Sequence, residues 1–430
     1  MKLHRNLVEA VLNALKMIFE EGRYADKVIE NVLQSNPRWG ARDRAFIAEN
    51  TYEIVRWWRL LLYLVKVDNV VNPSQFGDSL GFYWRIFGVW QLSQHQVLPD
   101  WDEFKHLDMN SIKQRLEDAQ KTRKIIESLP DWIDEIGEKE LGEKWENEVK
   151  ALNYQAPVIL RTNRLKTTRN ELQKLLAAND IETQSLQKAD LQDVAKINDD
   201  KNLENFYLSG LKDALVLGKR TNIFSSPHFK NGFFEIQDGA SQLVAPFLDV
   251  QEGMRVVDAC AGAGGKTLHL ASLMNNKGRI IALDTGEWKL EELKKRARRN
   301  GATTIESRVI DSTKIIKRLY DSADRLLLDV PCSGLGVLRR NPDSKWKLQP
   351  DFLENIKKTQ AEILQNYHKI LKKGGKMVYA TCSVLPSESE EQVQKFLKLQ
   401  DGAFELLAER RISPSETNFD GFYMACLVKK

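Results

Sequence analysis

The chain is poor in the residues from which several kinds of protein are built. It has four cysteines in 430 residues, and no two of them form a Cys-x-x-Cys pair. So few cysteines argue against a disulfide-stabilised secreted domain and against a zinc ribbon. The six histidines are scattered, without a partner at the spacing of metal ligands. We therefore expect no metal site.

Long hydrophobic runs are also missing. A transmembrane helix needs about 20 consecutive apolar residues, and the most apolar segment, Leu60–Val65, is far shorter. The N-terminus leads directly into an amphipathic pattern and has no signal-peptide core. The net charge of +4 is mild, so it permits a nucleic-acid partner without requiring one. These features predict a cytoplasmic protein that does not contact membranes.

The length allows two or three domains, and the pattern changes twice along the chain. Residues 1–145 have helical periodicity throughout, with a first apolar stripe and a second long helix expected at Asp43–Val65. We expect Trp57, Trp58, Trp84 and Trp90 to pack in this core or between helices rather than to stack on bases. Residues 146–235 alternate short strands with helices and predict a small α/β unit, whose Arg161 and Lys166 hint at phosphate contacts. Residues 236–430 form the third domain.

Strands alternate with helices from Gln237 to the C-terminus. This alternation predicts an α/β fold with a doubly wound, mostly parallel sheet. We expect helices at Lys289–Asn300 and Phe352–Leu371, the second ended by Lys372–Gly375. The expected strands are Arg255–Asp258, Arg279–Asp284, Glu306–Ile310, Arg325–Val330 and Lys376–Thr381, followed by Phe404–Arg411 and Gly421–Lys429.

A glycine-rich turn follows the first of these strands. The turn runs from Cys260 to Gly265, and Lys266 opens a helix. Glycines let a ligand approach the backbone closely, and the first amides of a helix are free donors. The pattern indicates a nucleotide or nucleoside ligand. It does not match a phosphate-binding P-loop, because the glycine that this motif needs five positions before Gly265 is replaced by Cys260. A dinucleotide fingerprint would need glycine or alanine at Thr267.

Carboxylates and thiols follow the predicted strands. Because the carboxyl ends of parallel strands meet at one edge of a sheet, we expect these side chains to converge there. The residues are Asp258, Asp284, Asp311, Asp329, Cys332 and Cys382. Asp284 has nearly the spacing at which an acid binds ribose hydroxyls. Two thiols beside a nucleoside pocket favour covalent catalysis, although spacing alone does not say which one is the nucleophile.

Four motifs carry a resemblance to a known family: DACAGAGGKT (Asp258–Thr267), DVPCSG (Asp329–Gly334), RRNPDSKW (Arg339–Trp346) and ATCS (Ala380–Ser383). They closely resemble those of the Sun/RsmB-type RNA (cytosine-5) methyltransferases. The match is strong over 235–430, moderate over 156–235 and weak over 1–145, where the bacterial ribosomal-RNA enzyme has a NusB-like helical domain. One departure is Ala263, since the family usually has proline there.

The resemblance implies a class I methyltransferase domain that transfers a methyl group from S-adenosylmethionine to C5 of a cytosine in RNA, with ribosomal RNA as the expected partner. It implies that Cys382 is the nucleophile, that Cys332 aids release of the methylated base, and that Asp329 binds the cytosine or the cofactor edge. Asp284 would bind the cofactor ribose and Asp311 its adenine amine. The methionine part would be wrapped by Cys260, Ala261, Gly262, Ala263, Gly264, Gly265 and Lys266.

Other interpretations stay open at this stage. Cys260 suits a packing role in the turn, and Asp311 could cap a helix. The basic residues Arg339, Arg340 and Lys345 are expected to contact RNA phosphates, the alternative being a solvated loop. The chain could instead methylate transfer RNA, a protein or a small molecule, or act as a non-catalytic ribosome-assembly factor. We expect a monomer.

Overall fold

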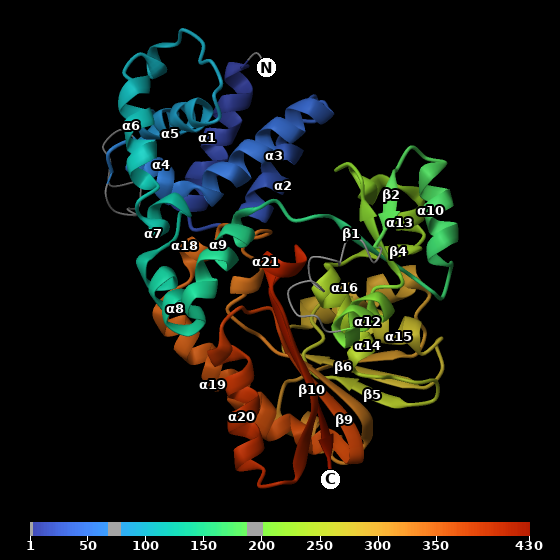
Figure 1. The fold of residues 1–430 in the computed structure, drawn as a ribbon. Helices are drawn as coiled ribbons and strands as arrows, with labels where there is room; N and C mark the ends of the chain where they lie inside the picture. Colours follow the sequence, from blue (N-terminus) through green and yellow to red (C-terminus); the bar gives the residue numbers. More distant parts are fainter. Residues whose placement is uncertain (1–2, 68–78, 187–200) are drawn as a thin grey trace. The chain divides into compact units, whose positions relative to one another are not determined.

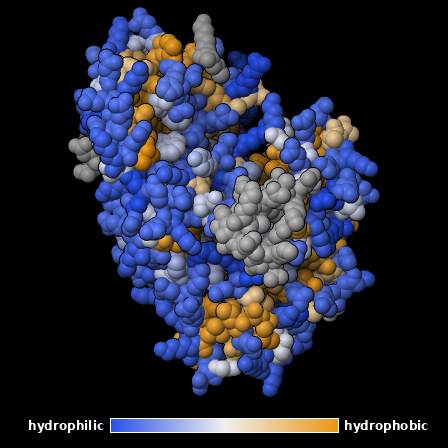
Figure 2. All heavy atoms as spheres, in the orientation of Figure 1, coloured by the Kyte–Doolittle hydropathy of each residue, from blue (hydrophilic) through white to orange (hydrophobic). Residues whose placement is uncertain are grey.

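A computed structural model describes residues 3–67, 79–186 and 201–430 (Figure 1). The chain forms two compact units, each described here by itself. The first comprises Met1–Tyr154 and Leu338–Pro350, and the second comprises Gln155–Val337 and Asp351–Lys430. Within the described residues, no helix has both the length and the apolar character needed to cross a membrane. Hydrophilic side chains predominate on the face that Figure 2 shows.

The first unit is helical, as predicted, and its core is built from the apolar stripe of the first helix. Leu7, Val11 and Leu15 are buried, and Trp58 stacks on Phe19 with ring centroids 3.8 Å apart. Trp84 and Trp90 are also buried, so the prediction that these tryptophans pack in the core is confirmed. The helices are α1 (Arg5–Phe19), α2 (Ala25–Ser35), α3 (Ala41–Arg56), α4 (Trp58–Leu64), α5 (Ser79–Ser93), α6 (Met109–Ala119), α7 (Arg123–Ile126), α8 (Asp131–Leu141), α9 (Trp145–Asn153) and the inserted α18 (Ser344–Lys347).

The single helix predicted over Asp43–Val65 is wrong. The chain breaks between α3 and α4 at Trp57, whose backbone leaves helical geometry (φ −97°, ψ 20°). The amides of Arg59 and Leu60 then donate to the hydroxyl of Ser128, at 2.9 and 3.4 Å. A distant side chain thus satisfies donors that a new helix start leaves free, and nothing in the local pattern reveals it.

A small four-stranded sheet begins the second unit. Its order is β2-β3-β1-β4 with antiparallel neighbours, and its core includes Leu160, Leu172 and Phe234. Thr168 and Glu171 form a capping box at the start of α10. The elements are β1 (Ile159–Thr162), α10 (Arg169–Ala177), β2 (Thr183–Ser185), α12 (Lys201–Gly210), β3 (Ala214–Leu217), α13 (Pro227–Lys230) and β4 (Phe234–Ile236).

The seven-stranded sheet has the order β10-β11-β9-β8-β5-β6-β7. Its pairs are parallel from β9 to β7, and β11 is antiparallel to both of its neighbours. This confirms the predicted doubly wound, mostly parallel sheet. The elements are α14 (Gly239–Phe247), β5 (Arg255–Asp258), α15 (Gly265–Leu273), β6 (Arg279–Asp284), α16 (Glu287–Asn300), β7 (Ile305–Val309), α17 (Thr313–Lys317), β8 (Ala323–Asp329), α19 (Pro350–Tyr367), β9 (Leu371–Thr381), α20 (Glu390–Leu399), β10 (Phe404–Ile412), α21 (Pro414–Thr417) and β11 (Phe422–Lys429).

Alternate residues of the strands enter two cores, one on each face of the sheet. Val256 and Ile280 join the core that includes Leu268 of α15 and Leu293 of α16. Val257 joins the opposite core, together with residues of α17, α19 and α20. The expected helix end at Lys372–Gly375 is wrong, because α19 ends at Tyr367 and those residues belong to β9.

Candidate active site

The glycine-rich turn between β5 and α15 has the shape that the sequence predicted. Gly262 and Gly264 have left-handed φ angles of 54° and 86°, and Gly264 is the N-cap of α15. Carbonyls in the turn are held from outside, because Arg296 donates to the carbonyl of Ala263 at 2.8 Å and Arg161 donates to that of Gly265 at 2.7 Å. The Arg296 bond anchors the position where the resembling family has proline.

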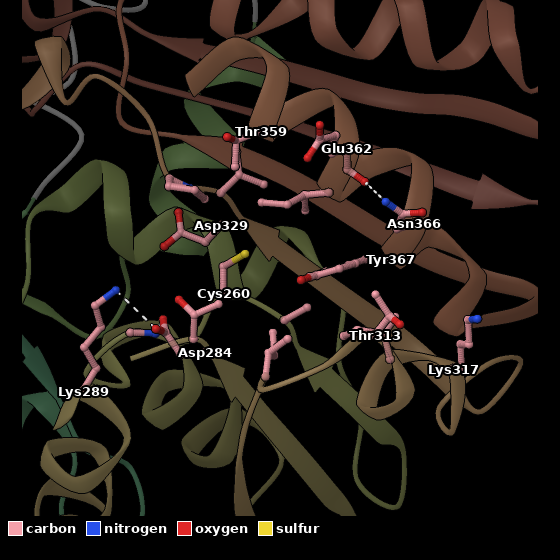
Figure 3. A pocket seen from close by; sticks show the side chains of 18 of the residues that line it. Cys260, Asp284, Lys289, Thr313, Lys317, Asp329, Thr359, Glu362, Asn366 and Tyr367 are labelled. Atoms are coloured by element: carbon pink, nitrogen blue, oxygen red, sulfur yellow. Dashed lines mark hydrogen bonds and ion pairs between the residues drawn. The ribbon is translucent and has the colours of Figure 1, made fainter. Parts of the chain in front are cut away.

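Asp284 ties this turn to the end of β6. Its Oδ2 accepts a hydrogen bond from the amide of Gly262 at 2.9 Å, and its Oδ1 accepts one from the amide of Gly286 at 2.7 Å. Lys289 approaches the same carboxylate at 3.3 Å. In Figure 3, Asp284, Cys260 and Asp329 border one space, opposite Tyr367. The acids predicted to follow β6 and β8 therefore meet beside the turn that follows β5.

A cavity of about 590 Å³ opens at this edge of the sheet. Of the residues proposed to bind a cofactor, Cys260, Gly262, Asp284 and Asp329 line it. Its other walls come from Ile310, from α17 and from one face of α19, and its lining includes Thr313, Ile316, Lys317, Tyr320, Thr359, Glu362, Ile363, Asn366 and Tyr367. The prediction missed the α19 wall. The spacing of Thr359, Glu362 and Asn366, which places them on one face of a predicted helix, could have indicated this wall.

The remaining proposed cofactor residues do not line the cavity. Ala261, Ala263, Gly264 and Gly265 shape the turn behind it, while Lys266 donates to Asp329 Oδ2 at 2.6 Å. Asp311 does not line the cavity either, and its predicted contact with the adenine amine stays a prediction. Asp311 is exposed and accepts a bond from the hydroxyl of Ser312, so Ile310 is the residue that reaches the cavity wall. Asp311 does not cap α17 either, since Ser312 is the N-cap.

The two thiols predicted at the strand ends lie together. Cys332 follows β8 and Cys382 follows β9, and their sulfur atoms are 3.2 Å apart. The hydrogen bond to Cys382, together with burial, raises the pKa of the Cys332 thiol well above its ordinary value. Pro331, the residue before Cys332, lines the cavity. The thiol pair thus lies at the border of the pocket, on adjacent strands.

The third cysteine of this edge has a different environment. Cys260 faces the cavity, and burial raises the pKa of its thiol well above the ordinary value. Asp258, the residue that ends β5, is buried, and burial raises its pKa to about 7. The hydroxyl of Thr267 donates to Asp258 Oδ2 at 2.7 Å. The Cys260 thiol and the Asp258 carboxyl therefore keep their protons to a higher pH than exposed groups of the same kind.

The expectation that Arg339 and Lys345 contact RNA phosphates also needs correction. Each side chain is 2% exposed, and the segment 338–350 packs inside the helical unit. Arg56 donates to the carbonyl of Arg339 at 3.0 Å, and Trp346 donates to the carbonyl of Val55 at 2.7 Å. Burial lowers the pKa of Lys345 well below its ordinary value. Arg339 and Lys345 are therefore buried and do not face solvent, whereas Arg340 is partly exposed and its predicted contact with RNA stays a prediction.

Basic residues of the small sheet likewise have internal partners. Arg161 is buried, which lowers its pKa to about 10, and besides Gly265 it bonds to Gln237. Lys166 donates to the carbonyls of Asn231 and Arg299, at 2.6 and 2.7 Å. The hint of phosphate contacts at Arg161 and Lys166 is thus replaced by a structural role. Among the residues described, no group of three or more His, Cys, Asp and Glu side chains could hold a metal ion.

Comparison with known proteins connects this geometry to a family. The model for "16S rRNA methyltransferase RsmB/F" matches residues 245–428, and the model for an RsmF/B-like ferredoxin-like domain matches residues 129–192. A Bacillus subtilis protein named "Probable ribosomal RNA small subunit methyltransferase B" is 32% identical over 475 residues, covering 98% of each chain. The chain belongs to the RsmB/F family of ribosomal RNA methyltransferases. It is an RNA methyltransferase.

Solved structures show the same fold. The crystal structure of PH0851 matches with a TM-score of 0.80 and 22% identity, covering 100% of both chains. A methyltransferase homologue from Pyrococcus horikoshii matches with a TM-score of 0.59 and 25% identity, covering 72% of this chain and 98% of that one. The larger sheet therefore has the class I methyltransferase fold that the resemblance predicted. The RsmB/F model spans every strand from β5 to β11.

Proposed function

We propose that the protein transfers a methyl group from S-adenosylmethionine to C5 of a cytosine in ribosomal RNA, through a covalent bond between Cys382 and C6. The observation that carries the proposal is the thiol pair. Cys332 and Cys382 lie 3.2 Å apart at the ends of adjacent strands, beside a pocket in a chain of the RsmB/F family. A reaction in which one thiol attacks the base and a second group assists its release can use two adjacent thiols.

The pocket has groups that suit S-adenosylmethionine. Gly262 lets a ligand approach the backbone, because a Cβ added there would meet no atom within 4 Å. Ile310, Ile316 and Ile363 offer apolar surface for an adenine ring, and Asp284 offers a carboxylate for ribose hydroxyls. When bound, the cofactor supplies a sulfonium methyl group, whose positive charge Asp329 favours. Asp311 directly follows Ile310 at the cavity wall, and its contact with the adenine amine stays part of the proposal.

The chemistry assigns a task to each thiol. C5 of cytosine is a weak nucleophile, and addition of the Cys382 thiolate to C6 gives C5 the electron density to take up the methyl group. The C5 proton then goes to a base, the C5–C6 double bond re-forms, and Cys382 leaves as a thiolate. We assign Cys332 to this release step. Its raised pKa supports the order, because a thiol that keeps its proton is a poor nucleophile.

Lys266 and Asp329 form an ion pair next to the thiols. Lys266 Nζ is 2.6 Å from Asp329 Oδ2, and both side chains are largely buried. We propose that this pair opens toward the substrate, so that Asp329 accepts a hydrogen bond from the cytosine amine while Lys266 faces the cofactor carboxylate or a phosphate. The target base has to leave its stack to reach this depth.

The first experiment tests the nucleophile. In a strain that lacks the gene, wild-type protein should restore 5-methylcytosine in ribosomal RNA, and Cys382→Ala should restore none. Bisulfite sequencing of ribosomal and transfer RNA measures both outcomes and separates the transfer-RNA alternative. Cys426→Ala is the control, because that thiol is buried in β11 and should leave methylation intact. Full activity of the Cys382 variant would contradict the proposal, and wild-type protein that restores no methylation would favour a non-catalytic assembly factor.

The reciprocal variant tests the release step. Cys332→Ala should form the bond to C6 but fail to release it, so a protein–RNA adduct should accumulate and survive denaturing gel electrophoresis. The double variant with Cys382→Ala should form none. If an adduct appears with Cys382→Ala alone, the two roles are reversed.

A further inference from the structure

The two cysteines begin turns of the same construction. Each is followed by a serine whose hydroxyl accepts the amide two residues further on. The amide of Leu335 bonds to Ser333 at 3.3 Å, and that of Leu385 bonds to Ser383 at 3.1 Å. Such side-chain turns hold the local backbone. The position of each sulfur atom therefore follows from the position of the serine beside it.

One carboxylate binds both serines. Glu388 is 0% exposed and follows Cys382 along the chain. Its Oε2 accepts hydrogen bonds from the hydroxyls of Ser333 and Ser383, each at 2.5 Å. Its Oε1 accepts bonds from the amide of Ser333 at 2.8 Å and from the side chain of Gln360 at 3.0 Å. The Glu388 carboxylate thus joins the loop after β8 to the loop after β9.

The surroundings of Glu388 are tied to the same region. Gln360 also donates to the carbonyl of Pro331, at 3.0 Å, and the Tyr379 hydroxyl donates to the carbonyl of Glu388 at 2.7 Å. No cation pairs with Glu388 in the part of the chain that the structure describes. A buried carboxylate is costly without a counter-charge, so its four hydrogen bonds to groups beside the thiols need a reason beyond packing.

We propose that Glu388 is a positioning residue that holds Cys332 and Cys382 beside each other by binding the serines that follow them. A carboxylate suits this task because it only accepts hydrogen bonds, so both hydroxyls must donate to it and keep their lone pairs for the amides. A glutamine would place an amide N–H against one of these donors. The charge has a second effect, since it opposes formation of a thiolate at Cys332.

The charged and titratable groups that act on Cys332 are few. The hydrogen bond to Cys382 is the largest influence that raises the pKa of Cys332, burial follows, and the charge of Glu388 adds to them. The Tyr379 hydroxyl, whose own pKa is raised by burial, also lies close. This inference rests on the proposed roles of the two thiols, so the measurement that decides it compares the reactivity of the thiols in the absence of RNA.

The test compares full-length wild-type protein with Glu388→Gln. Iodoacetamide alkylation of Cys382 and Cys332, followed by mass spectrometry from pH 6 to 9, gives the ratio of the two rates. We expect wild type to react mainly at Cys382 and the variant to lose most of that preference, with kcat for RNA methylation lower by about tenfold to a hundredfold at unchanged KM. Glu388→Asp, which keeps the charge, should recover part of the alkylation preference.

Glu235→Gln is the matched control. Glu235 is an equally buried carboxylate that binds Arg296, Arg299 and Asn300, so its loss should lower stability and leave the alkylation preference unchanged. A folded Glu388→Gln with the wild-type preference would overturn the proposal, as would an equal change in the control. If Glu388→Gln does not fold, Ser383→Ala and Ser333→Ala take its place. Loss of the alkylation preference in these variants would support the proposal, and the wild-type preference would overturn it. If wild type never methylates RNA, the proposed function fails, while the alkylation ratio still tests Glu388.

Discussion

At the scale of single residues, the site depends on buried polar groups whose charge state the surroundings set. Asp258 is the clearest example. Thr267 satisfies its Oδ2, whereas Oδ1 is buried without a protein partner among the described residues. Burial raises the pKa of Asp258 to about 7, far above the value of about 3.9 in an unfolded chain. The folded protein therefore binds one more proton than the unfolded chain between these values.

This difference predicts how stability depends on pH. Because the folded state holds the extra proton, the free energy of unfolding should fall as pH rises from about 4 to about 7. Asp258→Asn keeps the bond to Thr267 and removes that dependence. Its stability relative to wild type should rise from pH 5 to pH 8 by a few kcal/mol, since each pKa unit corresponds to about 1.4 kcal/mol. Guanidinium unfolding at both pH values measures this.

The exposed Asp401 provides the control for the Asp258 prediction. Asp401→Asn should give the same difference from wild type at both pH values. If the stability of Asp258→Asn differed from that of wild type by the same amount at both pH values, the carboxyl of Asp258 would titrate alike in the folded and unfolded states.

At the scale of elements, the end of β9 is held by close backbone contacts. Gly336 donates its amide to the carbonyl of Cys382 at 3.0 Å, and its carbonyl accepts the amide of Gly421 at 2.8 Å. A Cβ on Gly336 would lie 2.1 Å from the carbonyl oxygen of Gly421 and 2.7 Å from that of Cys382. Only glycine fits between these two segments.

Gly336→Ala should therefore displace the Cys382 loop. We expect loss of stability and a larger loss of methyl transfer, because Cys382, the proposed nucleophile, moves with its carbonyl. Gly374→Ala is the matched substitution at the other end of β9, where φ is +77° and no atom lies within 4 Å of the added Cβ. It should cost about 1–2 kcal/mol of stability through backbone strain and leave kcat unchanged. Unfolding curves and methylation assays of both variants check this, and equal activities would contradict it.

At the scale of the whole molecule, the chain leaves the helical unit twice. It passes from the helical unit at Tyr154, returns to that unit at Leu338 and leaves it again after Pro350. Within the helical unit, the inserted segment is bound by the amide of Ala25, which donates to Asp343 at 3.0 Å, and by Trp346. The segment comes directly after the Cys332 loop and directly before α19, which lines the pocket. The helical unit is therefore linked to both walls of the site through the covalent chain.

This organisation predicts the result of truncation. A fragment of residues 155–430 keeps the segment 338–350 but loses the helices that bury it, so it should be less soluble and unfold at a lower temperature than full-length protein. Replacing 338–350 by a short glycine–serine linker should restore the solubility of the fragment. Size-exclusion chromatography and thermal unfolding of the two fragments measure this. Equal solubility with and without the segment would contradict the prediction.

Local pattern was enough for the alternating strands and the glycine turn. β5 and β6 have the bounds that the sequence predicts, because alternating burial and turn chemistry are properties of neighbouring residues. The meeting of Cys332 with Cys382 also followed from sequence, since the ends of parallel strands share one edge. The roles of these residues, the three domain boundaries and the monomeric state stay predictions.

What only the tertiary structure decided is where charges and polar side chains point. The sequence assigned Arg339 and Lys345 to an RNA surface, yet both are buried in the helical unit. It contained no sign that Glu388 would bind the serines after both thiols. The chemical type of a side chain can be read from the sequence. Its exposure to solvent and its hydrogen-bond partners depend on segments far away in the chain. The sequence by itself therefore determined the fold and the convergence of the two thiols, and packing decided which polar groups bind beside them.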